Sequence, residues 1–188
     1  MGCTSTPAQT LYKFHPELDP LLAEILRRDP DGRLLLIEGR VANWTELLRE
    51  RFSRTMPEVT DRMVWLPAQP REDFLCLLAA ADVVLDPIHF GGGNTSYEAL
   101  AMGSPVVTLP GEFMRSRITR ALYERAGYTE LVADSGEAYV EAAVRLGTDE
   151  EWRSSVRDAL LDACEPLYEN PAEVDDLEEF LADATSSS

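Results

Sequence analysis

Short apolar runs alternate with amphipathic segments along most of the chain. The apolar runs predict strands at 33–38, 63–66, 83–86 and 105–109. Apolar side chains at helical spacing predict helices at 16–28, 71–81, 95–102, 115–126 and 137–146, and another that Asn43 or Thr45 caps before it runs through WTELLRERF. In the first helix, one face carries Leu21, Leu22, Ile25 and Leu26.

Uniformly apolar strands separated by helices imply a parallel sheet that is covered on both faces. We therefore expect a single α/β domain over 1–188, a doubly wound, Rossmann-like sheet whose core occupies about 11–148. Segment 149–188 predicts acidic helices and a disordered, Ser-rich end at 185–188. Ligands of such sheets bind at the carboxyl ends of the strands.

The stretch HFGGGNTSYEAL, residues 89–100, directly follows one predicted strand and opens a predicted helix. Gly91, Gly92 and Gly93 permit positive φ and let a ligand approach the backbone, while Asn94 and Thr95 add polar groups at the helix start. The spacing is neither that of a P-loop nor that of the GxGxxG fingerprint. An anion seat and a plain tight turn are both open at this point.

Glu98 has two explanations on the sequence alone. Thr95-Ser96-Tyr97-Glu98 matches a capping box, in which the glutamate accepts from the amide of the capping residue. Alternatively, its carboxylate accepts hydrogen bonds from a ribose diol, as acidic side chains do in nucleotide-binding folds. The spacing favours the cap.

Composition excludes several classes of partner. The formal net charge of −17 argues against nucleic acid and against anionic membrane surfaces. No stretch approaches the roughly 20 apolar residues of a membrane span. Cys3, Cys76 and Cys164 are odd in number and lack a CxxC pair, and Cys76 lies in an apolar run, so we expect a buried thiol and a reduced, cytoplasmic setting.

Isolated polar side chains carry weaker signals. Lys13 stands before the first helix, where a solvated surface lysine is the ordinary case. Arg115, Arg117 and Arg120 open a helix whose macrodipole they oppose, so a partner anion there would be useful.

The two histidines of the chain, His15 and His89, do not stand at zinc-finger spacing. His89 in its loop and Phe74 at a helix start are each more often packing residues than chemical ones. The sequence therefore predicts no metal site.

Three segments together carry a family resemblance: LYKFHPELD, ADVVLDPIHFGGGNTSYEALAMGSPVVTLPGE and SRITRALYERAG. They resemble the carboxyl-terminal half of the O-linked N-acetylglucosamine transferase family, which includes SPINDLY proteins and bacterial homologues linked to TPR repeats. The resemblance runs from about Leu11 to Leu161. It implies the GT-B architecture, in which this half holds the sugar nucleotide.

The resemblance assigns roles residue by residue. Lys13 matches the lysine that contacts the donor diphosphate and stabilises it as leaving group. Glu98 matches the ribose-binding position, and Gln69 and Phe74 fall in the segment that meets the base, with uracil or guanine left open. The implied donor-binding residues are Gly92, Gly93, Asn94, Thr95, Glu98, Gln69, Phe74 and Arg117, the last without an assigned task.

The implied activity is inverting transfer of N-acetylglucosamine, or a related sugar, from a UDP-sugar to a hydroxyl, such as that of a protein Ser or Thr. It needs no metal and no cofactor. The amino-terminal Rossmann-like half and the TPR repeats lie outside this sequence, so we expect the chain alone to be inactive. The alternative is a non-catalytic module that binds a nucleotide or a partner.

Overall fold

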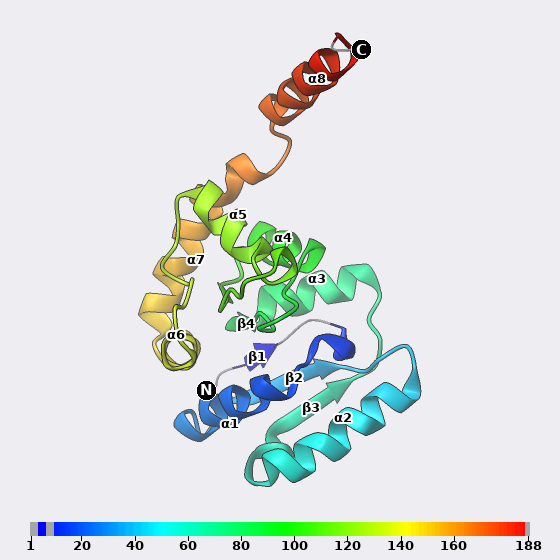
Figure 1. Cartoon of the computed structure of the whole chain (residues 1–188). Helices are drawn as coiled ribbons and strands as arrows, with labels where there is room; N and C mark the ends of the chain where they lie inside the picture. The colour runs from blue at the N-terminus through cyan, green and yellow to red at the C-terminus, as the bar shows by residue number, and fades with distance from the viewer. Residues whose placement is uncertain (1–3, 7–9, 187–188) are drawn as a thin grey trace.

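The computed structural model describes residues 4–6 and 10–186, and within them five parallel strands form one sheet in the order β3-β2-β1-β4-β5 (Figure 1). The strands are β1 (Thr4–Thr6), β2 (Arg33–Ile37), β3 (Met63–Leu66), β4 (Val83–Leu85) and β5 (Val106–Val107). The predicted doubly wound α/β fold is confirmed.

The central strand, β1, is the one that the hydrophobic pattern did not predict. It pairs with β2 on one side and β4 on the other. Its sequence is Thr-Ser-Thr, and the buried Thr6 donates from its hydroxyl to the carbonyl of Leu35 at 3.1 Å. A short polar strand gives no apolar run, so its place in the middle of the sheet shows only in the pairing.

Helices connect the strands, continue after β5 and cover both faces of the sheet. They are α1 (Asp19–Arg28), α2 (Ala42–Thr55), α3 (Arg71–Ala80), α4 (Asn94–Ala101), α5 (Ile118–Ala126), α6 (Gly136–Thr148), α7 (Glu150–Cys164) and α8 (Pro171–Ser186). α1 packs against α6, and α3 packs against α4. Right-handed crossovers put α1 and α3 on opposite faces of the sheet, so the two helix pairs lie on opposite faces as well. Figure 1 shows α8 projecting away from the rest.

Short 3-10 helices lie in several connections: η1 (Leu11–Lys13), η2 (Pro16–Leu18), η3 (Pro57–Arg62), η4 (Met114–Ser116) and η5 (Glu165–Leu167). Two of them correct the predicted helices. The helix predicted from residue 16 is η2 followed by α1, and the one predicted from 115 is η4 followed by α5. Proline at position 16 fits the start of η2, since its missing N–H would have no partner there.

Three further sequence predictions were wrong in detail. α2 begins at Ala42 without a side-chain cap, because the Thr45 hydroxyl instead accepts from the Gly39 amide at 2.9 Å. The strand predicted at 105–109 shortens to β5. Cys76 is exposed on α3 rather than buried.

The acidic carboxyl-terminal segment is helical, as predicted, and α7 is fixed to the domain by arginines. Arg153 forms an ion pair with Asp82 at 3.1 Å, and Arg157 donates to the carbonyl of Ala81 at 3.1 Å. α8 runs as far as Ser186, so the first half of the Ser-rich end is helical, and residues 187–188 lie outside the described residues. No helix in the described part of the chain has the length and apolarity needed to cross a membrane.

One buried phenol holds the edge strand β5. The Tyr123 hydroxyl accepts from the Val106 amide at 3.0 Å and donates to the Val106 carbonyl at 2.8 Å. A single hydroxyl from α5 thus satisfies both backbone groups on the outer side of this strand. Burial raises the pKa of Tyr123 well above its usual range, which keeps the hydroxyl protonated and able to donate.

We expect Tyr123→Phe to lower the free energy of unfolding by about 1–3 kcal/mol, because it leaves a buried amide and carbonyl of Val106 unpaired. Urea denaturation followed by circular dichroism measures the change. The matched control is Tyr128→Phe, which removes an exposed hydroxyl contact to Glu130. Equal losses in the two variants would contradict the role assigned to Tyr123.

Candidate functional site

The strand order reverses between β1 and β4, and the two segments that leave these strands meet. η1 with Lys13 follows β1, and the glycine loop of residues 89–93 follows β4. The crevice at such a switch point is where open α/β sheets bind ligands. The fold therefore brings Lys13 and the glycine loop together.

Asp86, directly after β4, holds the glycine loop in place through hydrogen bonds. Its carboxylate is buried, and it accepts from the Gly92 amide at 2.6 Å and from the Thr108 hydroxyl at 2.8 Å. Burial raises the pKa of Asp86, although hydrogen bonds from Thr119, Gly92 and Thr108 and the charge of Lys13 oppose that rise. The sequence analysis missed this residue.

Lys13 spans from η1 to the glycine loop. Its ammonium donates to the Gly91 carbonyl at 2.9 Å and lies 4.6 Å from the centre of the Phe90 ring. Partial burial lowers the pKa of Lys13, and the nearby Asp86 carboxylate opposes the shift. It is the single lysine of the chain, and it is half-buried rather than on the open surface.

The glycines of the loop permit positive φ, but none of the three adopts it, and a close approach requires glycine at Gly91. Within the described residues, positive φ among glycines occurs at Gly103 and Gly127. A Cβ on Gly91 would lie 2.8 Å from a carboxylate oxygen of Asp86, but one on Gly93 would meet nothing within 4 Å. Gly91 must be bare so that the loop can close over Asp86.

The start of α4 excludes one of the two explanations of Glu98, the helix cap. α4 begins at Asn94 with Gly93 as its N-cap, so Thr95 is not the capping residue and the capping box was wrong. The Glu98 carboxylate instead forms an ion pair with Arg71 of α3 at 3.4 Å and keeps a quarter of its side chain exposed. It therefore has capacity left for a ligand.

A pocket of about 310 Å³ lies at the carboxyl ends of β1, β2 and β3. It brings together three of the predicted donor-binding residues, Gln69, Phe74 and Thr95. Its lining is Thr10, Leu11, Ile37, Glu38, Gly39, Arg40, Trp44, Ala68, Gln69, Phe74 and Thr95. This volume is within the range of small-ligand sites.

Comparison with known proteins adds the family. The model of glycosyl transferase family 41 matches residues 6–169. The chain belongs to this family. The resemblance to the O-linked N-acetylglucosamine transferases is thereby confirmed.

The relatives are longer than this member of family 41. A UDP-N-acetylglucosamine–peptide N-acetylglucosaminyltransferase of Caenorhabditis elegans is 30% identical over 147 residues, which are 78% of this chain and 13% of the relative. A SPINDLY protein of Hordeum vulgare is 27% identical over 159 residues, 80% of this chain and 17% of the relative. The chain thus spans less than a fifth of either.

Solved structures support the GT-B assignment. An O-GlcNAc transferase of Thermobaculum terrenum superposes with a TM-score of 0.84 and 31% identity, over 94% of this chain and 35% of that one. A UDP-GlcNAc 2-epimerase of Neisseria meningitidis, bound to UDP-GlcNAc, gives a TM-score of 0.58 at 14% identity over 88% of this chain and 42% of that one, a likeness of fold alone.

The predicted arginines do not join the pocket. Arg117 is exposed at the start of α5 and donates to the Glu112 carbonyl at 3.5 Å. Arg120 pairs with Glu124 at 2.6 Å, and the Arg115 guanidinium stacks over Phe113. The backbone carbonyl of Arg115 does contact the glycine loop, since it accepts a hydrogen bond from the Gly91 amide at 2.9 Å. A donor-binding role for Arg117 stays a prediction.

An aromatic cluster beside Lys13 was also missed. Tyr12 meets Trp44 and Phe90 edge-to-face, with ring centres 5.6 and 6.1 Å apart. Trp44 lines the pocket. A sequence signal existed, because Tyr12, Asp86 and Phe90 lie within two of the segments that carry the resemblance.

We expect Gly91→Ala to lower the free energy of unfolding by about 1–3 kcal/mol, because the new methyl group would displace the buried Asp86 carboxylate from its partners. Gly93→Ala, two residues away, should cost clearly less. Thermal and urea unfolding of the two variants provide the comparison. The reverse order of stabilities would contradict the arrangement of the loop around Asp86.

Proposed function

We propose that this chain is the donor-binding half of an inverting glycosyltransferase, which takes N-acetylglucosamine or a related sugar from UDP to a hydroxyl of a protein Ser or Thr. The observation that carries the proposal is the contact between Lys13 and the glycine loop, at the switch point and next to the pocket. The name of the Caenorhabditis elegans relative states the donor and the peptide acceptor of that protein, which supports the choice.

The diphosphate would lie between Lys13 and the start of α4. The first amides of a helix have no partner within the helix, and its dipole favours an anion there. In α4 these amides belong to Asn94 and Thr95, and the Thr95 side chain lines the pocket. Gly93 leaves its Cβ position open, so a phosphate oxygen can approach the backbone.

The nucleoside would occupy the 310 Å³ pocket. Phe74 is half-buried there and offers a ring for stacking on the base. The Gln69 amide already donates to the Pro67 carbonyl at 2.6 Å, which holds it at the pocket wall with its oxygen available to accept. Glu98, whose carboxylate pairs with Arg71, would accept from the ribose hydroxyls.

The proposed chemistry is a direct displacement at the anomeric carbon. The acceptor oxygen forms a bond to that carbon while the bond to the diphosphate breaks, and negative charge grows on the leaving diphosphate. The Lys13 ammonium and the α4 amides would stabilise this charge electrostatically. In this scheme these groups take over the leaving-group stabilisation for which other enzymes use a metal ion.

The acceptor side and the base that deprotonates the hydroxyl would come from a second Rossmann-like half. We therefore expect this chain by itself to bind the donor without turning it over. In that sense the isolated chain would behave as the non-catalytic binding module of the alternative reading. We place the protein in the cytoplasm, a choice supported by free thiols at Cys76 and Cys164.

Calorimetric titration with UDP tests the site. We expect Lys13→Ala to weaken binding by about tenfold to a hundredfold, since a charge-assisted contact contributes about 1.5–3 kcal/mol. Arg28→Ala, which removes an exposed cation of α1, is the charge-matched control and should bind as the parent does. Parallel titrations with GDP and with the sugar conjugates show whether the site prefers uracil or guanine.

Two results would contradict the assignment. One is the absence of binding to UDP, GDP or their sugar conjugates at millimolar concentration in a folded sample. The other is equal affinity of the parent and Lys13→Ala for UDP, which would remove Lys13 from the site.

The ribose role of Glu98 has its own test, a comparison of UDP with 2′-deoxy-UDP. In the parent chain the deoxy nucleotide should bind about tenfold more weakly, because one hydrogen bond to a charged group is lost. In Glu98→Ala the two nucleotides should bind alike, whereas Glu141→Ala on α6 should preserve the difference. An undiminished preference for UDP in Glu98→Ala would assign the ribose contact elsewhere.

A further inference from the structure

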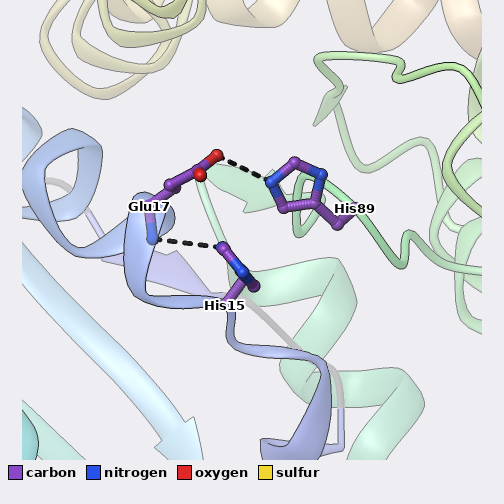
Figure 2. A group of neighbouring side chains, drawn as sticks. All are labelled: His15, Glu17 and His89. Atoms are coloured by element: carbon purple, nitrogen blue, oxygen red, sulfur yellow. Dashed lines mark hydrogen bonds and ion pairs between the residues drawn. The ribbon is translucent and has the colours of Figure 1, made fainter.

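Beside the proposed donor site, the fold brings both histidines of the chain together with a glutamate (Figure 2). His15 is the residue directly before η2, Glu17 lies within η2, and His89 comes from the glycine loop. One ligand atom from each side chain lies within 4.8 Å of the other two. All three side chains are exposed, and none lines the 310 Å³ pocket.

Existing contacts hold these side chains in place. The His15 Nδ1 accepts from the Glu17 amide at 3.3 Å, which makes His15 the N-cap of η2. The His89 Nε2 lies 2.8 Å from a Glu17 carboxylate oxygen, and the two imidazole rings meet edge-to-face with centres 4.5 Å apart. Figure 2 shows the Glu17 carboxylate turned toward the His89 ring.

We propose that His15, Glu17 and His89 bind a divalent transition-metal ion of the zinc class. Two imidazoles and a carboxylate form a donor set that Zn²⁺ accepts, with water at the remaining position. Imidazole nitrogen favours zinc, copper and nickel, whereas magnesium and calcium prefer sites made of oxygen. A small movement of the side chains brings the three ligand atoms to the spacing that one ion requires.

Such an ion would join two segments that are far apart in the sequence. Glu17 and His89 are 72 residues apart, and each lies close to one partner of the Lys13–Gly91 contact. The ion would therefore fasten η1 and η2 to the glycine loop and stabilise the folded chain by mass action. Its role is structural or regulatory, and it stands apart from the proposed donor chemistry.

Without a metal, the 2.8 Å contact between His89 Nε2 and the Glu17 carboxylate is a hydrogen bond, which becomes an ion pair when the ring is protonated. The pKa of Glu17 is lowered, chiefly by its hydrogen bond to His89 and further by the charges of His89 and His15. Metal binding requires unprotonated imidazoles, so an ion and a proton compete for the same nitrogen atoms. Titration with a metal distinguishes the two states.

The test is a calorimetric titration of the chain with ZnCl₂ in the absence of nucleotide, together with thermal unfolding. The parent should bind one Zn²⁺ and unfold at a higher temperature when the metal is present. His15→Ala, His89→Ala and Glu17→Gln should each weaken binding by about tenfold or more, since each removes one ligand. Thermal unfolding without metal shows whether each of these three variants is folded.

Thiols are the competing ligands, so Cys3→Ser/Cys76→Ser provides the matched control and should bind Zn²⁺ as the parent does. The proposal is overturned if the parent does not bind Zn²⁺, if the histidine variants and Glu17→Gln bind it unchanged, or if the cysteine variant alone loses it. Because no nucleotide is present, failure of this test leaves the proposed donor site unaffected, and failure of UDP binding leaves this one unaffected.

Discussion

The buried carboxylate of Asp86 is the constraint on which the site depends. It receives the Gly92 amide and the Thr108 hydroxyl, and its charge faces the ammonium of Lys13. Because a buried carboxylate needs these partners, the loop after β4 must fold over it, which excludes a side chain at Gly91. The loop leads into the start of α4, where Thr95 lines the pocket.

The alternation of apolar runs and amphipathic helices was enough to predict the fold class, because buried parallel strands need apolar side chains on both faces. It could not reveal β1, whose Thr-Ser-Thr sequence has no apolar pattern although two strands flank it. The edge strand β5 was predicted too long because its pairing with β4 covers Val106 and Val107, after which Thr108 forms an isolated bridge with Val132. Strand pairing is a tertiary property, and local sequence does not contain it.

The candidate site was predictable where a motif carried it, and less so where chemistry depends on distant contacts. The resemblance pointed to Lys13, Gln69, Phe74 and Thr95, and the pocket joins the last three. Spacing favoured a helix cap for Glu98, but α4 begins one residue early and the carboxylate pairs across to α3. An acidic chain can still hold an anion, because a diphosphate needs one cation and a few amides at short range, and distant charges are screened.

The most direct test of the central claim is the pKa of the Lys13 amine, measured by NMR on the unmodified chain with and without UDP. Lys13 is the single lysine, so its side-chain signal is readily assigned. The account predicts a pKa below the ordinary value of about 10.4 in the free chain, because burial lowers it, and a rise on saturation with UDP, because the diphosphate favours the charged ammonium. An ordinary pKa that UDP leaves unchanged would contradict it.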